Sequence, residues 1–178
     1  HRVHRRQRQM CIRDRPQSQR IDLMSEVVRT VGKATKQNEY PIITTQILCT
    51  HTRLPNEVNQ AIVDLAVQMP EYVCAIDVAG GDNNYKERID EFIKLYKYAR
   101  EQGLKTTGHL YETPNGCHQE LLPYLMRIGH GVQIPLKYPK LLKEVANQGQ
   151  CLEVCPTTYF KTGNMKKMGQ FKIEFYKC

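Results

Sequence analysis

From about residue 21 onward, the chain alternates between two patterns of apolar and polar residues. Short runs rich in β-branched and apolar residues predict five strands, over residues 42–49, 72–78, 104–108, 127–129 and 151–155. Apolar residues at helical spacing predict helices over residues 22–37, from Asn56 onward, and over 85–102, 119–125, 138–148 and 170–177. Strands that alternate with helices in this way are typical of parallel βα units.

Two architectures consist of such units, a doubly wound sheet and a (β/α)8 barrel. No Gly-rich phosphate loop follows the first strand, and residues of chemical interest follow several strands rather than one switch point. We therefore predict an α/β fold, a partial TIM (β/α)8 barrel with about five parallel strands alternating with helices. A complete barrel has eight strands and about 250 residues, so residues 21–178 are predicted to be an incomplete barrel domain.

The net charge of +8 is concentrated at the beginning of the chain. Residues 1–20 contain seven Arg and one Asp, which gives +6 and leaves +2 for the remainder. This segment has no apolar periodicity, and its string RQMCIRDR resembles a translated sequencing adapter, so we expect a non-native or disordered leader. A near-neutral body and the lack of a membrane-length apolar run predict a cytoplasmic protein with no nucleic-acid and no membrane partner.

The seven cysteines do not indicate a disulfide framework, because their number is odd and no signal sequence precedes them. Cys49, Cys74, Cys151 and Cys155 lie in apolar, strand-like runs. We expect them to be small buried hydrophobic residues. No pair has C-x-x-C spacing, which disfavours a structural zinc site.

The greatest concentration of chemically useful residues lies between residues 105 and 132. His109 ends one predicted strand, Glu112 follows three residues later, and His130 ends the next strand. Residues at the ends of successive parallel strands meet on one face of a barrel, where barrel enzymes have their active sites. Each residue alone also has an ordinary interpretation, as a structural histidine or a solvated loop carboxylate. Their spacing favours a common site.

Five motifs follow one another at spacings of about one helix each. They are Ile47 to Pro55, AIDVAG (75–80), H-x-x-E (109–112), RIGHG (127–131) and LEVCPTTYFKTG (152–163). Together they resemble the adenosine deaminase family of zinc aminohydrolases. The resemblance implies an eight-stranded barrel that binds one catalytic Zn²⁺ and hydrolytically deaminates adenosine or a related purine nucleoside or base, with release of ammonia.

The same resemblance implies a role for each matching residue. His109 would be a zinc ligand, and Glu112 would protonate N1 of the purine ring. His130 would orient, or accept a proton from, the attacking water, whose pKa zinc lowers toward about 7. Gly80 would lie beside the purine, and Asp77 near the floor of the substrate site.

The chain also departs from the family pattern. Well-known members have His-Ala-Gly-Glu where this chain has two bulky residues, Leu110 and Tyr111, so adenine, a modified adenosine or an adenosine nucleotide is a possible substrate. The family's other zinc ligands, a His-x-His pair on the first strand and an Asp on the eighth, match no segment. Because catalytic zinc usually has three protein ligands, we expect an active parent enzyme and an inactive isolated fragment. Another metal-dependent amidohydrolase and a non-catalytic scaffold or binding protein are the alternatives.

Overall fold

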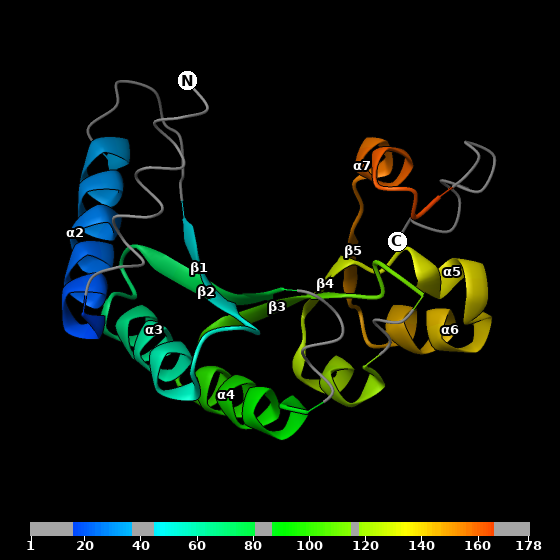
Figure 1. Cartoon of the computed structure of the whole chain (residues 1–178), viewed down its shortest axis with the longest axis horizontal. Helices are drawn as coiled ribbons and strands as arrows, with labels where there is room; N and C mark the ends of the chain where they lie inside the picture. Colours follow the sequence, from blue (N-terminus) through cyan, green and yellow to red (C-terminus); the bar gives the residue numbers. More distant parts are fainter. Residues whose placement is uncertain (1–15, 37–44, 81–86, 115–117, 166–178) are drawn as a thin grey trace.

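A computed structural model describes residues 16–36, 45–80, 87–114 and 118–165. Its five strands form one parallel sheet in the order of the chain (Figure 1). They are β1 (Gln46–His51), β2 (Val73–Ala79), β3 (Lys105–Leu110), β4 (Arg127–His130) and β5 (Cys151–Glu153). A doubly wound sheet would reverse its strand order at a switch point, and these strands do not. The prediction of a partial barrel is confirmed.

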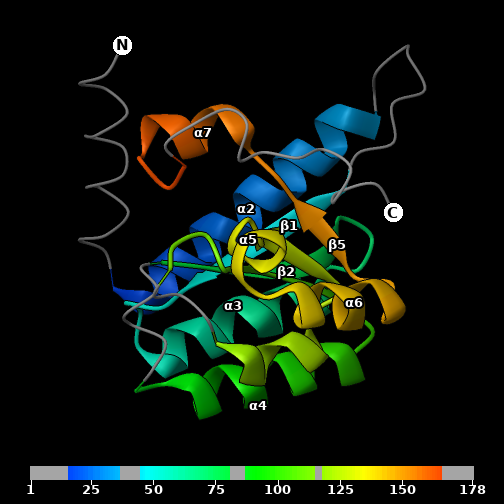
Figure 2. The same ribbon diagram turned by 90° about the vertical axis from the view of Figure 1, so that its right-hand side faces the viewer.

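Helices precede, connect and follow the strands. They are α2 (Gln17–Lys36), α3 (Asn56–Gln68), α4 (Ile89–Glu101), the 3₁₀ helix η2 (Gln119–Tyr124), α5 (Gln133–Lys137), α6 (Pro139–Asn147) and α7 (Pro156–Lys161). Helices α2, α3, α4 and α6 lie around the outside of the curved sheet, whereas α7 lies at the end of β5 (Figures 1 and 2). This is the arrangement of the outer helical ring of a barrel.

The hydrophobic core lies between the outer face of the sheet and these helices. Leu48 of β1 pairs with Ile76 of β2 in the register, and both side chains are buried. Val63 of α3 and Phe92 of α4 belong to the same cluster, at 0% and 1% exposure. Full burial of such a side chain contributes about 1.5–3 kcal/mol, so the outer face is the principal source of stability in the described part.

The inner face of the sheet is polar. Cys49 pairs with Asp77, and Gly129 pairs with Glu153, along the rows of inner positions. Three of the four described cysteines, Cys49, Cys151 and Cys155, are exposed, and Cys74 is half-buried. The prediction that these cysteines are buried is therefore wrong. Alternation along β1 and β5 places Cys49 and Cys151 on the inner face, which the five described strands leave open to solvent.

Several element boundaries differ from those predicted. Helix α2 begins at Gln17, inside the predicted leader, and the domain boundary after residue 20 stays a prediction. Asn56 is the first residue of α3, and Pro55 is the N-cap residue. Helices α5 and α7 were not predicted, and α7 begins at Pro156, directly after the last predicted strand. The helix predicted over residues 170–177 lies outside the described residues.

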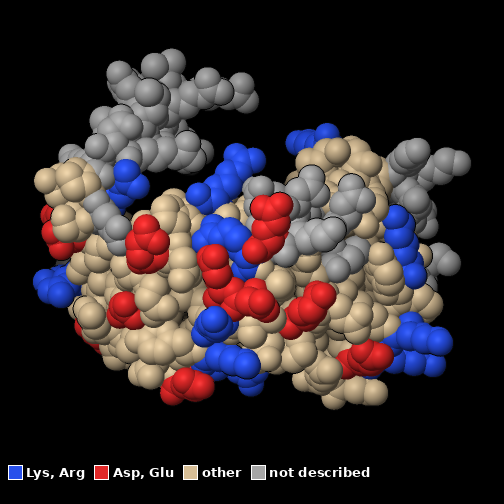
Figure 3. All heavy atoms as spheres, turned by 60° about the horizontal axis from the view of Figure 1, so that its bottom comes forward, with Lys and Arg blue, Asp and Glu red and all other residues tan. Residues whose placement is uncertain are grey.

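The outer surface carries charges of both signs. On the face seen in Figure 3, Lys and Arg side chains are interspersed with Asp and Glu rather than gathered into one basic patch. This distribution agrees with the nearly balanced charge of residues 21–178. Within the described ranges, no helix combines the length and apolar character needed to cross a bilayer.

Candidate active site

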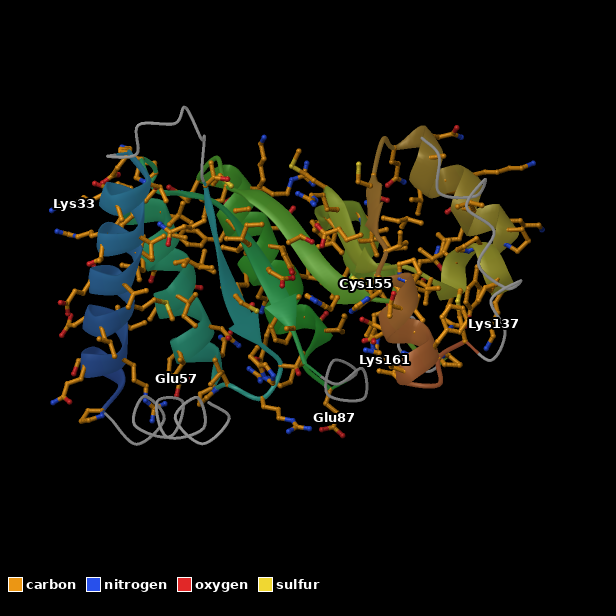
Figure 4. All side chains as sticks on the ribbon, turned by 90° about the horizontal axis from the view of Figure 1, so that it is seen from above. Lys33, Glu57, Glu87, Lys137, Cys155 and Lys161 are labelled. Carbon is orange, nitrogen blue, oxygen red and sulfur yellow. The ribbon has the colours of Figure 1, made fainter. Side chains whose placement is uncertain are left out.

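The ends of β2, β3 and β4 bring four of the predicted site residues together. Asp77 comes from β2, His109 from β3 and His130 from β4, and Glu112 follows β3 by two residues. The rings of His109 and His130 meet edge to face with 5.1 Å between their centroids. Figure 4 looks onto the inner face, where the strand arrows point toward the edge at which Cys155 and α7 lie. The predicted cluster therefore forms at the carboxyl ends of the strands.

Asp77 contacts His109 directly. Its Oδ1 lies 3.2 Å from His109 Nδ1, which also lies 3.3 Å from the carbonyl oxygen of Val78. The hydrogen bond with Asp77 raises the pKa of His109, against the opposing effect of burial. A carboxylate that holds one ring nitrogen orients the other toward its ligand, as in many metal sites. The substrate role that we assigned to Asp77 stays a prediction, and its observed contact is with the histidine.

His130 owes its position to an unusual backbone conformation. It pairs with the buried, outward-facing Leu110 in the register, so regular alternation would turn its side chain toward the helices. Its φ is +73°, in the left-handed region that non-glycine residues rarely adopt. The ring instead lies on the inner side, with Nε2 3.4 Å from Glu112 Oε2. Such local strain is often found at functional sites.

Glu112 is held from several directions. The backbone N–H of Gln133 donates to the carbonyl oxygen of Tyr111 at 3.0 Å, and the Gln133 side chain donates to that of Glu112 at 3.2 Å. Asn164 Nδ2 donates to Glu112 Oε1, also at 3.2 Å. Neither amide was predicted to be a site residue, although Asn164 directly follows the last matched motif. They fix the loop and the carboxylate that the H-x-x-E pattern identified.

Gly129 allows β3 and β4 to approach closely beside His109. A Cβ atom at Gly129 would lie 3.1 Å from His109 Cα and 3.2 Å from His109 Cγ. Both distances are shorter than ordinary carbon contacts. Gly129 therefore permits the close approach of the two strands, and the residue that it accommodates is His109.

Gly80 has the positive φ expected of a strand-to-helix turn, +133°. A Cβ atom at this position would overlap Thr52 Oγ1, a buried hydroxyl without a hydrogen-bond partner among the described residues. Contact with Thr52 is thus sufficient reason for a glycine here. The position of Gly80 beside a purine stays a prediction.

Leu110 and Tyr111 do not narrow the wall of the site. Both are buried in the main hydrophobic cluster, at 0% and 2% exposure. The Tyr111 ring packs edge to face against Tyr138, with 5.6 Å between centroids. The substrate argument based on the bulk of these two side chains therefore loses its physical basis.

The described residues do not by themselves form a metal site. No group of three or more His, Cys, Asp or Glu within the described ranges is arranged to hold a metal ion. His109 fits as one ligand, with Asp77 behind it, but a catalytic zinc usually needs three protein ligands. Any metal bound by the whole protein would require ligands from elsewhere.

The family model for adenosine deaminase matches residues 9–176, nearly the whole chain. The chain belongs to the adenosine deaminase family. The adenosine deaminase of Lactococcus lactis subsp. lactis is 25% identical over 158 residues, which cover 85% of this chain and 44% of that protein. The chain thus spans less than half the length of this relative.

Two solved structures of known proteins share the fold of this chain. Arabidopsis ADAL, complexed with GMP, superposes with a TM-score of 0.66 at 21% identity, over 81% of this chain and 44% of that one. The adenine deaminase of Arthrobacter aurescens has a TM-score of 0.66 at 19% identity, over 79% and 43%. At these identities the likeness establishes the fold alone. In both comparisons the chain covers less than half of the other structure.

Proposed function

We propose that this chain is a segment of a zinc-dependent enzyme that hydrolytically deaminates an adenine-containing purine. In this proposal Glu112 donates a proton to the purine ring, and His109 is one zinc ligand. His130 orients, or accepts a proton from, the attacking water. The observation that carries the proposal is the contact of Glu112 with His130 next to the His109 ring, at the carboxyl ends of neighbouring strands. Membership of the adenosine deaminase family supports the reaction class.

The chemistry assigned to the described residues is proton transfer and positioning. Addition of water to C6 of the purine and loss of the amino group as ammonia require a proton on the ring nitrogen and another on the leaving group. Glu112 is 28% exposed and lies at the open edge, so a substrate can reach its carboxyl group. His130 is 3.4 Å from this carboxyl group, and such distances shorten in substrate complexes. Zinc would supply the activated water.

The substrate class is proposed only as adenine-containing purines. Relatives and structural neighbours include proteins described as adenosine deaminase and adenine deaminase, and one neighbour was solved with GMP. Leu110 and Tyr111 are buried in the core, so they supply no argument against adenosine. Adenosine, adenine and AMP are therefore the three substrates to compare.

The test is made in the complete enzyme that contains this segment. Glu112→Gln removes the proton donor but keeps the size and hydrogen-bonding capacity of the side chain. We expect kcat to fall by about 10²–10⁴-fold while the zinc content, measured by elemental analysis, stays at the wild-type level. His109→Ala should instead lower the zinc content. Glu120→Gln, an exposed carboxylate on η2, is the matched control and should leave both quantities unchanged.

Two results would contradict the reaction or the role of Glu112. One is a zinc-loaded complete enzyme that releases no ammonia from adenosine, adenine or AMP. The other is a Glu112→Gln variant with wild-type kcat, which would exclude Glu112 as the proton donor. Full zinc content in His109→Ala would remove the ligand assignment.

A further inference from the structure

The loop that follows β1, residues 52–55, lies at the carboxyl end of that strand. In a parallel barrel the carboxyl ends of all strands share one face, so this β1 loop lies on the face of the candidate active site. The backbone N–H of Thr52 donates to the carbonyl oxygen of Ala79 at 2.9 Å. The buried Thr52 side chain lies against Gly80, where a Cβ atom would overlap its hydroxyl group. The β1 loop and the Gly80 turn are therefore in direct contact.

Asn59 on α3 holds the β1 loop from one side. Its side chain is buried, at 1% exposure. Its Oδ1 accepts a hydrogen bond from the backbone N–H of His51 at 3.0 Å. Its Nδ2 donates to the carbonyl oxygens of His51 at 3.1 Å and of Leu54 at 3.4 Å. Both ends of the amide are thus bonded to the backbone on either side of Thr52.

Arg88, at the beginning of α4, holds the same loop from the other side. Its Nη1 donates to the carbonyl oxygens of Thr52 and Leu54, both at 2.7 Å. Its Nε and Nη2 donate to Glu91 Oε2 at 2.9 and 2.7 Å. Four of the five N–H groups of the guanidinium therefore have acceptors. The guanidinium carbon also lies 5.5 Å from the centroid of the buried Phe92 ring, so the group is fixed in both position and orientation.

The local structure does not explain an arginine at this position. Arg88 is the N-cap residue of α4, and its side chain makes no capping hydrogen bond. Ser, Thr, Asp and Asn are the preferred N-cap residues, and the helix dipole disfavours a cation at this end of a helix. The guanidinium instead bonds to a loop 36 residues earlier in the chain. Its tertiary contacts therefore account for Arg88, and such conflicts with local preference are expected at functional sites.

We propose that Arg88 is a positioning residue, which holds the β1 loop in place and keeps Thr52 against Gly80. Asn59 from α3 and Arg88 from α4 then fix the loop from two helices. In the proposed deaminase Gly80 lies beside the purine, so Arg88 would act on substrate binding through Thr52 and the Gly80 turn. This consequence rests on the proposed function, whereas the hold on the loop does not.

Hydrogen exchange, measured by mass spectrometry on the complete enzyme, tests the hold on the loop. Arg88→Met keeps an unbranched side chain over Phe92 but removes every N–H donor. The amides of residues 52–54 should then exchange at least about tenfold faster, because hydrogen bonds from charged donors are among the strongest in proteins. The amides of β4 should exchange as in the wild type. Arg88→Lys keeps the charge but not the planar fork that reaches two carbonyl groups and Glu91, so its loop amides should exchange at an intermediate rate.

Arg100→Met is the matched control. Arg100 is also on α4, and its Nη1 donates to the carbonyl oxygen of Pro123 at 2.9 Å. This variant loses a guanidinium–carbonyl bond from the same helix, but exchange over residues 52–54 should not change. Unchanged exchange in Arg88→Met, or an equal increase in Arg100→Met, would overturn the proposal without reference to activity.

Activity in the same enzyme separates this proposal from the proposed function. We expect Arg88→Met to raise KM for the purine more than it lowers kcat, and Arg88→Lys to recover part of the loss. If exchange rises in Arg88→Met but KM and kcat keep their wild-type values, the residue is only structural and the positioning role is overturned. If exchange rises as expected but the wild type deaminates no purine, the hold on the loop stands and the deaminase function fails. If deamination occurs and exchange in Arg88→Met is unchanged, the function stands and this proposal fails.

Discussion

The close approach of two strands beside His109 makes Gly129→Ala a sensitive test of the site. The new Cβ would lie 3.1 Å from His109 Cα and 3.2 Å from His109 Cγ. Favourable carbon contacts begin at about 3.5 Å, so the strands must separate by a few tenths of an ångström. The closer atom belongs to the backbone of β3 and cannot rotate away. Gly129 does not have a positive φ, so the substitution adds no left-handed strain.

The expected cost is that of overpacking, about 1–3 kcal/mol. Urea denaturation followed by circular dichroism measures it. With a slope of about 2 kcal/mol per molar urea, a loss of about 2 kcal/mol would lower the midpoint by about 1 M. The His109 ring signals should shift in the same variant, because its Cα and Cγ are the atoms that are displaced.

Gly103→Ala provides the comparison. No atom lies within 4 Å of a Cβ at Gly103, but its φ is +84°, so alanine there should cost about 1–2 kcal/mol through backbone strain alone. The His109 signals should not move in this variant. If Gly129→Ala changes the unfolding free energy by less than about 0.5 kcal/mol, the usual range for a surface substitution, and leaves His109 unshifted, the packing between β3 and β4 is not as close as described.

The remaining predictions concern the inner face of the sheet. Asp77→Asn removes the main cause of the raised pKa of His109, so an NMR titration should give a lower value than in the wild type or in the exposed control Asp90→Asn. Because the folded-state pKa of His109 exceeds the ordinary value of 6.5, its protonation stabilises the fold below about pH 6.5. This stabilisation is lost as the pH rises through the folded-state pKa. Over the same rise in pH, the urea midpoint should fall less in Asp77→Asn than in the wild type. Cys49 is exposed as a residue, but desolvation of its sulfur and the neighbouring Asp77 charge raise the pKa of its thiol to about 12. Iodoacetamide at about pH 8 should therefore alkylate Cys49 more slowly than Cys151, and equal rates by peptide mass spectrometry would contradict this.

Much of the fold follows from local patterns. Five strands and most helices were predictable because apolar residues recur with periods set by the geometry of each element. The lack of a Gly-rich loop after the first strand, and the residues of chemical interest at several strand ends, favoured a barrel over a doubly wound sheet. The ends of the strands also identified His109, Glu112 and His130. Such inferences succeed because they depend only on residues that are near one another in the chain.

The face of the sheet on which a side chain lies was harder to predict than the strands themselves. The apolar neighbours of Cys49 and Cys151 suggested burial, but strand register places both on the polar inner face. His130 shows the opposite case, because its left-handed φ turns the ring away from the side that alternation predicts. No local signal distinguishes a histidine in this conformation from one in a regular strand.

The sequence by itself determined the strands, most of the helices, their alternation along the chain and the three residues that carry the proposed chemistry. Only the tertiary structure decided which groups hold them: Asp77 against His109, and Asn164 against Glu112. Asn164 and Glu112 are 52 residues apart in the chain. Contacts at such separations depend on strand register, on the turn that begins α7 and on single backbone dihedrals. None of these is encoded in the periodicity of a short segment, because each is set by the packing of the whole sheet.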